Sequence, residues 1–492
     1  MVPSKKLVCK EFLLFTFAFL LLASCSIQKQ ISRSAKQVIN DSSLLTAHVG
    51  ISIYDPAENK YWYNYNGDKY FVPASNTKIP TCYAAMKYLG DSLVGLRYGY
   101  PEELSWRNNS IIIGPTGDPT FLHSDYPKQP VFDFLKQEIL FKKKKPGIYF
   151  DTASHVERWG SGWSWNDYDE SYMAERNIFP VFGNIIDIKL GNIQNRTTAD
   201  VGIKKISNLF KTNSHYFDSL LNNERVNATI GVKNASEISP KIKITRDISR
   251  NEFSVWPDKN SFSAQSIPFV TNTTATVANI LLDTLKQGFA YVFPSSRNEY
   301  QWSSYHYGET ELVTISKWNI IHSQPTDSLL KPMMHRSDNF FAEQSLLMVS
   351  NEMLGVMNDE KIIDTLLKTD FKDIPQKPRW ADGSGLSRYN LFTPQDFVFI
   401  LNKMKNEFGM DRIKVILPTG GEGTISNYYK TEAGYIYAKT GTLSGVVAFS
   451  GFLYTKKGKL LIFSTLVNNH RASATDIRRA IEKFLQEIRS KH

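Results

Sequence analysis

The chain has 492 residues, which is long for one compact domain and predicts two or three. Its 42% hydrophobic and 13% aromatic residues are typical of a folded protein with a core and exclude a largely disordered one. The net charge of +10 could indicate nucleic acid, an anionic membrane surface or an acidic polymer as partner. Because the basic residues are scattered and the sequence contains no recognisable nucleic-acid module, we expect no nucleic-acid partner.

Residues 1–25 have the pattern of an export signal. Lysines precede the apolar run Phe12–Leu22, which is too short to span a bilayer as a permanent helix. The run ends in Leu22-Ala23-Ser24-Cys25, which resembles the lipobox of bacterial lipoproteins. The resemblance implies cleavage before Cys25, lipidation of that cysteine, and a mature protein tethered to a membrane and facing the periplasm. An ordinary secretory signal with a chance cysteine is the alternative.

Cysteine and histidine usage argues against a metal site. Once Cys9 is removed with the signal and Cys25 carries lipid, Cys82 is the remaining cysteine, so no internal disulfide or thiolate site can form. We expect Cys82 to be a small buried residue. The nine histidines form no His-x-x-x-His pair, and we predict a site without metal or cofactor.

The first part of the fold is predicted to be a hairpin followed by a helix. Residues 26–46 are expected to be a polar tether and the start of the fold. Ala47–Tyr54 and Tyr61–Tyr65 have the composition of paired strands, and Thr77–Leu89 has that of a helix. Pro80 conflicts with a regular helix, where an interior proline costs about 3 kcal/mol. Either the first turn is irregular or the helix bends.

Residues 91–264 differ in character, with short aromatic-rich strands and frequent turns. The lack of long amphipathic helices indicates a separate β-rich insertion. The expected strands are Ser110–Ile113, Gly147–Asp151, Ile185–Leu190 and Arg225–Val232. Phe132–Phe141 is expected to be a helix.

Helical periodicity returns after the insertion, over Thr273–Gln287 and over Ser328–Val349, which is interrupted near Ser337. The C-terminal third predicts an antiparallel three-stranded meander and a helix with one apolar face to pack on a sheet. These elements are Tyr435–Lys439, Val446–Tyr454, Leu460–Asn468 and about Ser473–Arg489.

Three short motifs carry the candidate chemistry: Ser75-Asn76-Thr77-Lys78, Ser337-Asp338-Asn339 and Lys439-Thr440-Gly441-Thr442. A serine and a lysine three residues apart on a helix share one face, which lets the amine reach the hydroxyl and take its proton. The spacing alone is weak evidence, since Ser328 and Lys331 repeat it on what we interpret as a solvated helix face. Lys-Thr-Gly occurs once, on a predicted strand where an edge could bind an extended peptide.

Together the motifs resemble those of penicillin-recognising serine enzymes. The chain is similar to the penicillin-binding protein 4 type of D-alanyl-D-alanine carboxypeptidase/endopeptidase. The matching stretches are Pro73–Lys78, Gly117-Asp118-Pro119, Met334–Asn339 with Ala342-Glu343, Asp382–Leu386, and Lys439–Leu443. Pro115-Thr116, where the family has a second glycine, is a local departure.

The resemblance implies an α+β fold of the transpeptidase/β-lactamase type, with an antiparallel sheet flanked by helices. Ser75 and Ser337 are 262 positions apart, farther than in β-lactamases, and in this family the gap holds inserted domains. We therefore expect a catalytic domain in two parts, 47–90 and 265–492, with a large β-rich insertion over 91–264.

The resemblance also implies a role for each motif residue. Ser75 would attack the carbonyl between two D-alanines to form an acyl-enzyme. Lys78 would be its base, provided that burial or the charge of Lys439 lowers its pKa. Ser337 would relay a proton to the leaving amine with help from Lys439, and Asn339 would hold a substrate amide.

The strand that carries the third motif would bind substrate through Thr440, Gly441 and Thr442. The two threonines would meet the terminal carboxylate, and the backbone N–H groups of Ser75 and Thr442 would form the oxyanion hole. Asp382–Gly385 is expected to be a turn that shapes the site rather than a second nucleophile.

The predicted function is that of a serine-type D-Ala-D-Ala carboxypeptidase/endopeptidase that acts on peptidoglycan stem peptides and is acylated by β-lactam antibiotics. A β-lactamase-like hydrolase and a non-catalytic peptidoglycan-binding protein are the alternatives. A Ser-His-Asp hydrolase is disfavoured because the sequence contains no Gly-x-Ser-x-Gly elbow.

Overall fold

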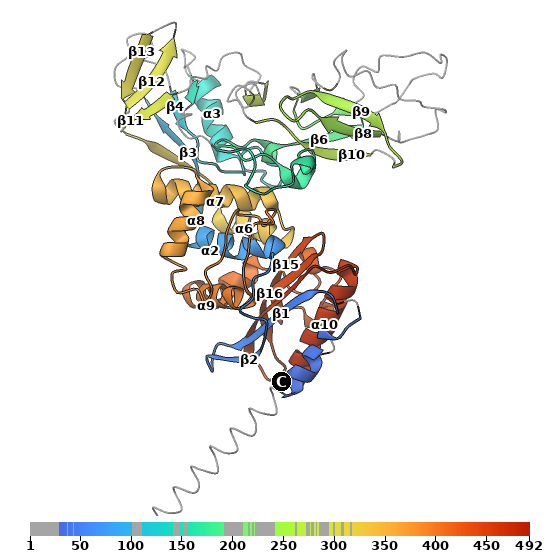
Figure 1. Cartoon of the computed structure of the whole chain (residues 1–492). Coiled ribbons are helices and arrows are strands. Elements are labelled where there is room, and N and C mark those ends of the chain that lie inside the picture. The colour runs from blue at the N-terminus through green and yellow to red at the C-terminus, as the bar shows by residue number, and fades with distance from the viewer. Residues whose placement is uncertain are drawn as a thin grey trace, which may run out of the picture.

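The computed structural model describes residues 29–36, 38–42, 44–100, 111–140, 148–150, 156–190, 242–260, 263–271 and 317–492, with short pieces between 210 and 314. The predicted signal with Cys25 and the predicted strand Arg225–Val232 lie outside the described residues. Figure 1 shows an elongated molecule, with one sheet and α10 at the lower end, helices in the middle and the smaller sheets at the upper end.

A five-stranded antiparallel sheet forms the lower part of the molecule. Its order is β15 (Ile436–Leu443), β16 (Val446–Tyr454), β17 (Leu460–Asn468), β1 (His48–Asp55) and β2 (Lys60–Tyr65). The predicted hairpin and meander are confirmed. The strand β15 continues to Leu443, so the whole Lys-Thr-Gly triplet lies on an edge strand.

Each face of this sheet packs against helices. Along β16, Val447 and Phe449 join the core that includes α10 (Ala474–Lys491), while Ala448 and Phe452 join the core on the opposite face. This alternation is the period of two that a strand buried on both faces shows. The predicted α+β fold with an antiparallel sheet flanked by helices is confirmed.

The helices of the middle part are α2 (Lys78–Tyr88), α6 (Thr326–His335), α7 (Asn339–Leu354), α8 (Asp359–Lys368) and α9 (Pro394–Ile416). A 3₁₀ turn, Ala74–Thr77, precedes α2 and places Pro80 in the first turn of that helix. There an N–H would have no helical partner, so the proline costs little. The irregular first turn is thus the correct alternative. Cys82 is fully buried on α2, as predicted.

The start of the described chain is helical and not the polar tether that the sequence suggested. Residues 29–36 and 38–39 are helical. Ile31, Ala35 and Val38 are buried in the core that includes α10. Their spacing of four and three residues forms an apolar helix face, which the polar residues between them obscured. Within the described part of the chain, no helix combines the length and apolar character needed to cross a bilayer.

The upper part holds the smaller sheets. One has the order β14 (Asn319–Pro325), β3 (Ser92–Gly99), β4 (Ile111–Gly114) and β5 (Ile148–Phe150), and another β10 (Ala264–Pro268), β6 (Ile185–Leu190) and β7 (Phe210–Lys211). The remaining strands and the helix are β8 (Ile242–Arg246), β9 (Phe253–Pro257), β11 (Ser295–Asn298), β12 (Gln301–His306), β13 (Glu309–Thr314) and α3 (Pro130–Leu140). The predicted β-rich character of this region is confirmed.

Strand pairing bears on where the insertion ends. The strand β10 pairs with β6, and β14 pairs with β3, so both join strands that follow residue 91. After Pro325 the chain enters α6, whose Leu329 and Met333 lie in the core that also contains α2. We therefore propose that the insertion extends to about residue 325 rather than 264.

Candidate active site

The first predicted pair, Ser75 and Lys78, lies at the junction of the 3₁₀ turn and α2. The Lys78 amine donates to Ser75 Oγ at 3.0 Å, to Asn339 Oδ1 at 2.6 Å and to the Ser384 carbonyl at 2.7 Å. Ser75 is partly exposed, whereas Lys78 is fully buried. The pair therefore joins a hydroxyl that solvent can reach to an amine that is protected from water.

These contacts suit a neutral amine. Such an amine has two N–H donors and one lone pair, and the oxygens of Asn339 and Ser384 can only accept. When Lys78 is neutral, its hydrogens go to those oxygens and its lone pair faces the Ser75 hydroxyl. Burial lowers the Lys78 pKa to about 8, against the opposing charges of Asp382 first and then of Glu343 and Asp338.

Ser328 and Lys331, which have the same spacing by chance, do not form a serine–lysine contact of this kind. Ser328 Oγ donates to the Pro325 carbonyl at 2.6 Å, and the Lys331 side chain is exposed. This local side chain to backbone bond is the one expected of a serine near a helix start.

Ser337 and Lys439 form a second serine–lysine pair. The Lys439 amine donates to Ser337 Oγ at 2.8 Å and to the Thr440 carbonyl at 2.7 Å. Ser337 has a φ of 60°, a left-handed conformation between α6 and α7, and Asp338 caps α7 by accepting from Phe341 N. Burial, followed by the Lys78 charge, lowers the Lys439 pKa well below its usual range. The Lys439 amine therefore holds a proton less firmly than an exposed lysine does.

Asn339 joins the first pair to the insertion. Its Oδ1 accepts from Lys78, and its Nδ2 donates to the Tyr172 backbone carbonyl at 2.9 Å. Tyr172 belongs to the 3₁₀ turn Ser171–Met173 of the insertion. The Asn339 amide thus already holds a peptide carbonyl, which is the type of contact predicted for a substrate.

The strand β15 runs directly against the Ser75 turn. A Cβ placed on Gly441 would lie 2.6 Å from the Pro73 carbonyl oxygen and 3.0 Å from Ser75 N. Glycine is therefore required here to bring the strand and the Ser75 amide together. Thr440 Oγ1 donates to Thr424 Oγ1 at 2.7 Å.

A family model described as D-Ala-D-Ala carboxypeptidase 3 (S13) matches residues 31–232 and 318–488 of the chain. The chain belongs to this family. It is 24% identical over 461 residues to a D-alanyl-D-alanine carboxypeptidase DacB of Haemophilus influenzae, covering 86% of each chain. It is 25% identical over 469 residues to a D-alanyl-D-alanine carboxypeptidase of Actinomadura sp. strain R39, covering 89% of this chain and 80% of that protein.

The crystal structure of penicillin binding protein 4 (dacB) from H. influenzae matches with a TM-score of 0.65 at 20% identity and covers 93% of this chain and 98% of that one. This agreement confirms the fold. The family membership confirms the predicted activity, so the protein is a serine-type D-Ala-D-Ala carboxypeptidase.

The loop Asp382–Ser387 of the carboxypeptidase supplies the carbonyl that holds Lys78, and a buried carboxylate shapes it. Asp382 Oδ1 accepts from Gly385 N and Asn390 Nδ2, each at 2.8 Å. Its Oδ2 accepts from Ser387 N at 2.7 Å and Trp163 Nε1 at 2.9 Å. The turn predicted here is present, and Ser384 acts through its backbone, with its side chain buried.

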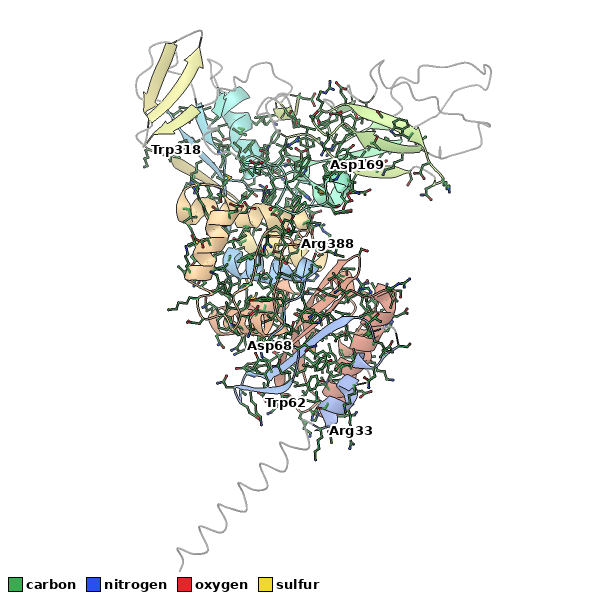
Figure 2. All side chains as sticks on the ribbon, in the orientation of Figure 1. Arg33, Trp62, Asp68, Asp169, Trp318 and Arg388 are labelled. Atoms are coloured by element: carbon green, nitrogen blue, oxygen red, sulfur yellow. The ribbon has the colours of Figure 1, made fainter. Side chains whose placement is uncertain are left out.

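Residues of the insertion brace this loop, and no sequence motif indicated their role. Besides Trp163, the buried Arg176 guanidinium lies 3.5 Å from Glu343 Oε2, whose Oε1 accepts from Ser384 N at 2.7 Å. Burial, followed by the charge of Asp382, raises the Glu343 pKa to about 7, although the Arg176 charge acts in the opposite direction. Figure 2 shows Asp169 of the insertion directly above Arg388, which follows the loop.

Arg478 is a further residue that sequence reasoning missed. It lies on α10, and its guanidinium donates to Thr442 Oγ1 at 2.5 Å. The cation is therefore next to a threonine predicted to meet the terminal carboxylate. An arginine on a helix packed behind the sheet carries no motif, so only the fold reveals it.

Proposed function

We propose that Ser75 is the nucleophile and Lys78 the base with which the carboxypeptidase removes the terminal D-alanine of peptidoglycan stem peptides. The observation that carries this proposal is the set of Lys78 contacts, since two fixed acceptors direct the amine lone pair to Ser75 Oγ. An otherwise weak hydroxyl nucleophile needs an adjacent base of this kind.

The steps follow from the positions of the two serine–lysine pairs. The Ser75 oxygen bonds to the carbonyl carbon while its proton passes to Lys78, and the bond to the D-alanine nitrogen then breaks. Ser337, held by Lys439, delivers a proton to that nitrogen. Water then hydrolyses the acyl-enzyme by the reverse sequence of proton transfers.

Substrate binding is supported by β15 and Asn339. The outer edge of β15 is already paired at Tyr437 and Ala438, through Thr419 and the Pro418 carbonyl. An extended peptide would pair with the edge beyond Ala438, and its terminal carboxylate would meet Thr440 and Thr442 with Arg478 nearby. The closeness of Gly441 to Ser75 N supports an oxyanion hole made from the amides of Ser75 and Thr442. A substrate carbonyl would replace that of Tyr172 on Asn339.

The nucleophile can be tested by covalent labelling. We expect a fluorescent penicillin to label the wild type and Ser328→Ala equally and to leave Ser75→Ala unlabelled, because the Ser75 hydroxyl lies beside the Lys78 amine whereas Ser328 is bonded to a backbone carbonyl. Gel fluorescence of the intact chain measures this. Labelling of Ser75→Ala at the wild-type level would show that another residue is acylated.

The acylation rate should depend on the protonation of Lys78. Below pH 8 the amine is mostly protonated and has no lone pair for the Ser75 proton, whereas above pH 8 it is mostly neutral. We therefore expect the second-order rate constant of penicillin acylation to rise about tenfold per pH unit below 8 and to level off above it. A rate that is constant from pH 6 to 9 would contradict the role of Lys78 as base.

We propose that the same site also cleaves D-alanyl cross-links, since carboxypeptidase and endopeptidase reactions share one acyl-enzyme. Mass spectrometry of products from defined monomeric and cross-linked muropeptides tests it. Loss of D-alanine from monomers with cross-linked dimers left intact would limit the enzyme to carboxypeptidase action.

We propose that the mature protein is a periplasm-facing lipoprotein anchored through Cys25, and the lipobox-like sequence supports this. We expect the wild type in the membrane fraction of producing bacteria and Cys25→Ala with altered processing and no lipid. Metabolic labelling with a fatty acid measures this, with Cys82→Ala as the matched control. Equal fatty-acid labelling of Cys25→Ala would rule out this anchor.

A further inference from the structure

The described chain begins in a helix with a basic outer face. Residues 29–36 and 38–39 are helical. Spacings of four and three residues bring side chains to one face of a helix. On this helix Lys29, Arg33 and Lys36 have that spacing and are exposed, and the uncharged Gln30 is exposed beside them.

This helix is fixed to the body of the carboxypeptidase, so its basic face has a defined direction. Ile31 and Ala35 are no more than 1% exposed. Ser34 Oγ donates to Glu487 Oε2 at 2.6 Å, and Lys491 Nζ of α10 lies 3.5 Å from Ser34 Oγ. The helix is thus part of the fold and carries its cations outward.

Further cations lie at the same end of the molecule. The turn after β16 carries the exposed Lys456 and Lys457, and Lys456 N donates to the Arg489 carbonyl of α10 at 3.0 Å. Lys483 is exposed on α10. We define the basic end by six residues: Lys29, Arg33, Lys36, Lys456, Lys457 and Lys483.

Nearby carboxylates compensate part of this positive charge, since Glu432 and Glu487 line the same hollow as Lys456 and Lys483. Glu487 is engaged by Ser34 and Lys491, and Asp55 and Glu58 are engaged by Lys459, which is outside the six. Figure 2 shows Arg33 at the lowest part of the described molecule, opposite the insertion, and Figure 1 shows the C-terminus at this same end.

The position of Cys25 gives this end a definite neighbour, and this step rests on the proposed lipid anchor. From Cys25 to Lys29 the chain advances four residues, which span at most about 14 Å when fully extended. Electrostatic attraction in physiological salt acts over about 8 Å. An acyl chain on Cys25 therefore holds Lys29, the first residue of the basic end, within about two Debye lengths of the membrane surface.

We propose that the basic end is a docking surface for anionic lipid headgroups. Cations near an anionic leaflet each add attraction, and lipid chains combined with a basic patch anchor a protein more firmly than the chains alone. Docking by this end points the insertion away from the membrane and holds the Ser75 site between the two. The long axis of the carboxypeptidase is therefore roughly perpendicular to the membrane, and the active site meets peptidoglycan at a distance from the lipid surface.

The test uses the mature polypeptide from Ser26 without lipid, which keeps every described residue and separates headgroup binding from anchoring. Binding to vesicles of equal parts phosphatidylglycerol and phosphatidylcholine is measured by co-sedimentation at low salt. We expect Lys29→Gln/Arg33→Gln/Lys36→Gln to weaken binding about 100-fold, from roughly fivefold per cation. We expect 0.5 M NaCl to abolish binding of the wild type.

The matched control is Lys361→Gln/Lys372→Gln/Lys377→Gln, which removes the same charge from exposed positions in the middle part. It should bind like the wild type. Equal losses in both triple variants, or equal wild-type binding to pure phosphatidylcholine, would overturn the proposal. Binding to soluble polyphosphate that depends on the three cations, without binding to vesicles, would overturn it too and identify a polyanion as the occupant. D-alanine release should be unchanged in both triple variants. A loss of release would indicate damage to the active site and would bear on the proposed function rather than on lipid docking.

Discussion

Replacing Lys78 with methionine should lower D-alanine release and penicillin acylation by at least about 10³-fold. Methionine fills a similar volume but has no lone pair for the Ser75 proton. It also leaves Ser75 Oγ without the amine that lies 3.0 Å away. Release of D-alanine from a pentapeptide and the rate of penicillin labelling measure the two effects.

The same substitution should have a limited effect on the stability of the fold. The Lys78 pKa is about 8 in the folded protein against a usual 10.5, so the unfolded chain binds more protons between those values and stability rises with pH across that window. Below pH 8 the buried charge costs about 3 kcal/mol. Lys78→Met removes this cost, although the oxygens of Asn339 and Ser384 each lose a donor. We expect the free energy of unfolding at pH 7 to change by less than about 2 kcal/mol, because removal of the buried charge offsets the two acceptors left unpaired.

The matched control is Lys331→Met, which removes the lysine that lies three residues after Ser328. This variant should keep full activity, since Ser328 is bonded to the Pro325 carbonyl. If Lys78→Met retained more than about a tenth of the acylation rate, another group would have to remove the Ser75 proton.

The sequence predicted the parts of the site that depend on short-range order. Three-residue spacing allowed Ser75 to contact Lys78, but the order of the three motifs was needed to distinguish this pair from Ser328 and Lys331. The apolar patterns of β16 and β17 placed both strands with their observed limits. The joining of Ser337 to Lys439 depended on the family resemblance, because 102 residues separate them and no local pattern implies the contact.

The contacts that the sequence could not predict are made either by backbone groups or by residues of the insertion that contact the catalytic part. The Ser384 carbonyl binds Lys78 irrespective of the side chain at 384, so residue identity carries no signal. Trp163 reaches Asp382 from 219 positions away. The proposed end of the insertion near residue 325 rests on the long-range pairing of β14 with β3, whereas the predicted end at 264 rested on a local change in periodicity.

Asp382→Ala should cause the largest loss of stability among substitutions near the site. The carboxylate is fully buried and accepts from the backbone N–H groups of Gly385 and Ser387 and from the side chains of Asn390 and Trp163. Each buried donor left without an acceptor costs about 1–3 kcal/mol. We expect the free energy of unfolding, measured by urea denaturation, to fall by at least about 4 kcal/mol. The exposed Asp373→Ala should change it by less than about 0.5 kcal/mol.

Trp163→Phe separates the effect of the insertion on the site from general destabilisation, because it removes one donor to Asp382 and leaves the carboxylate in place. We expect a loss of about 1 kcal/mol in unfolding free energy. We also expect a drop of at least about tenfold in kcat, since a small displacement of the Ser384 carbonyl misdirects the Lys78 amine. The stability effects of Trp163→Phe and Asp382→Ala should be strongly non-additive if their hydrogen bond couples the two segments. Additive losses with an unchanged kcat would show that the insertion covers the loop without positioning it.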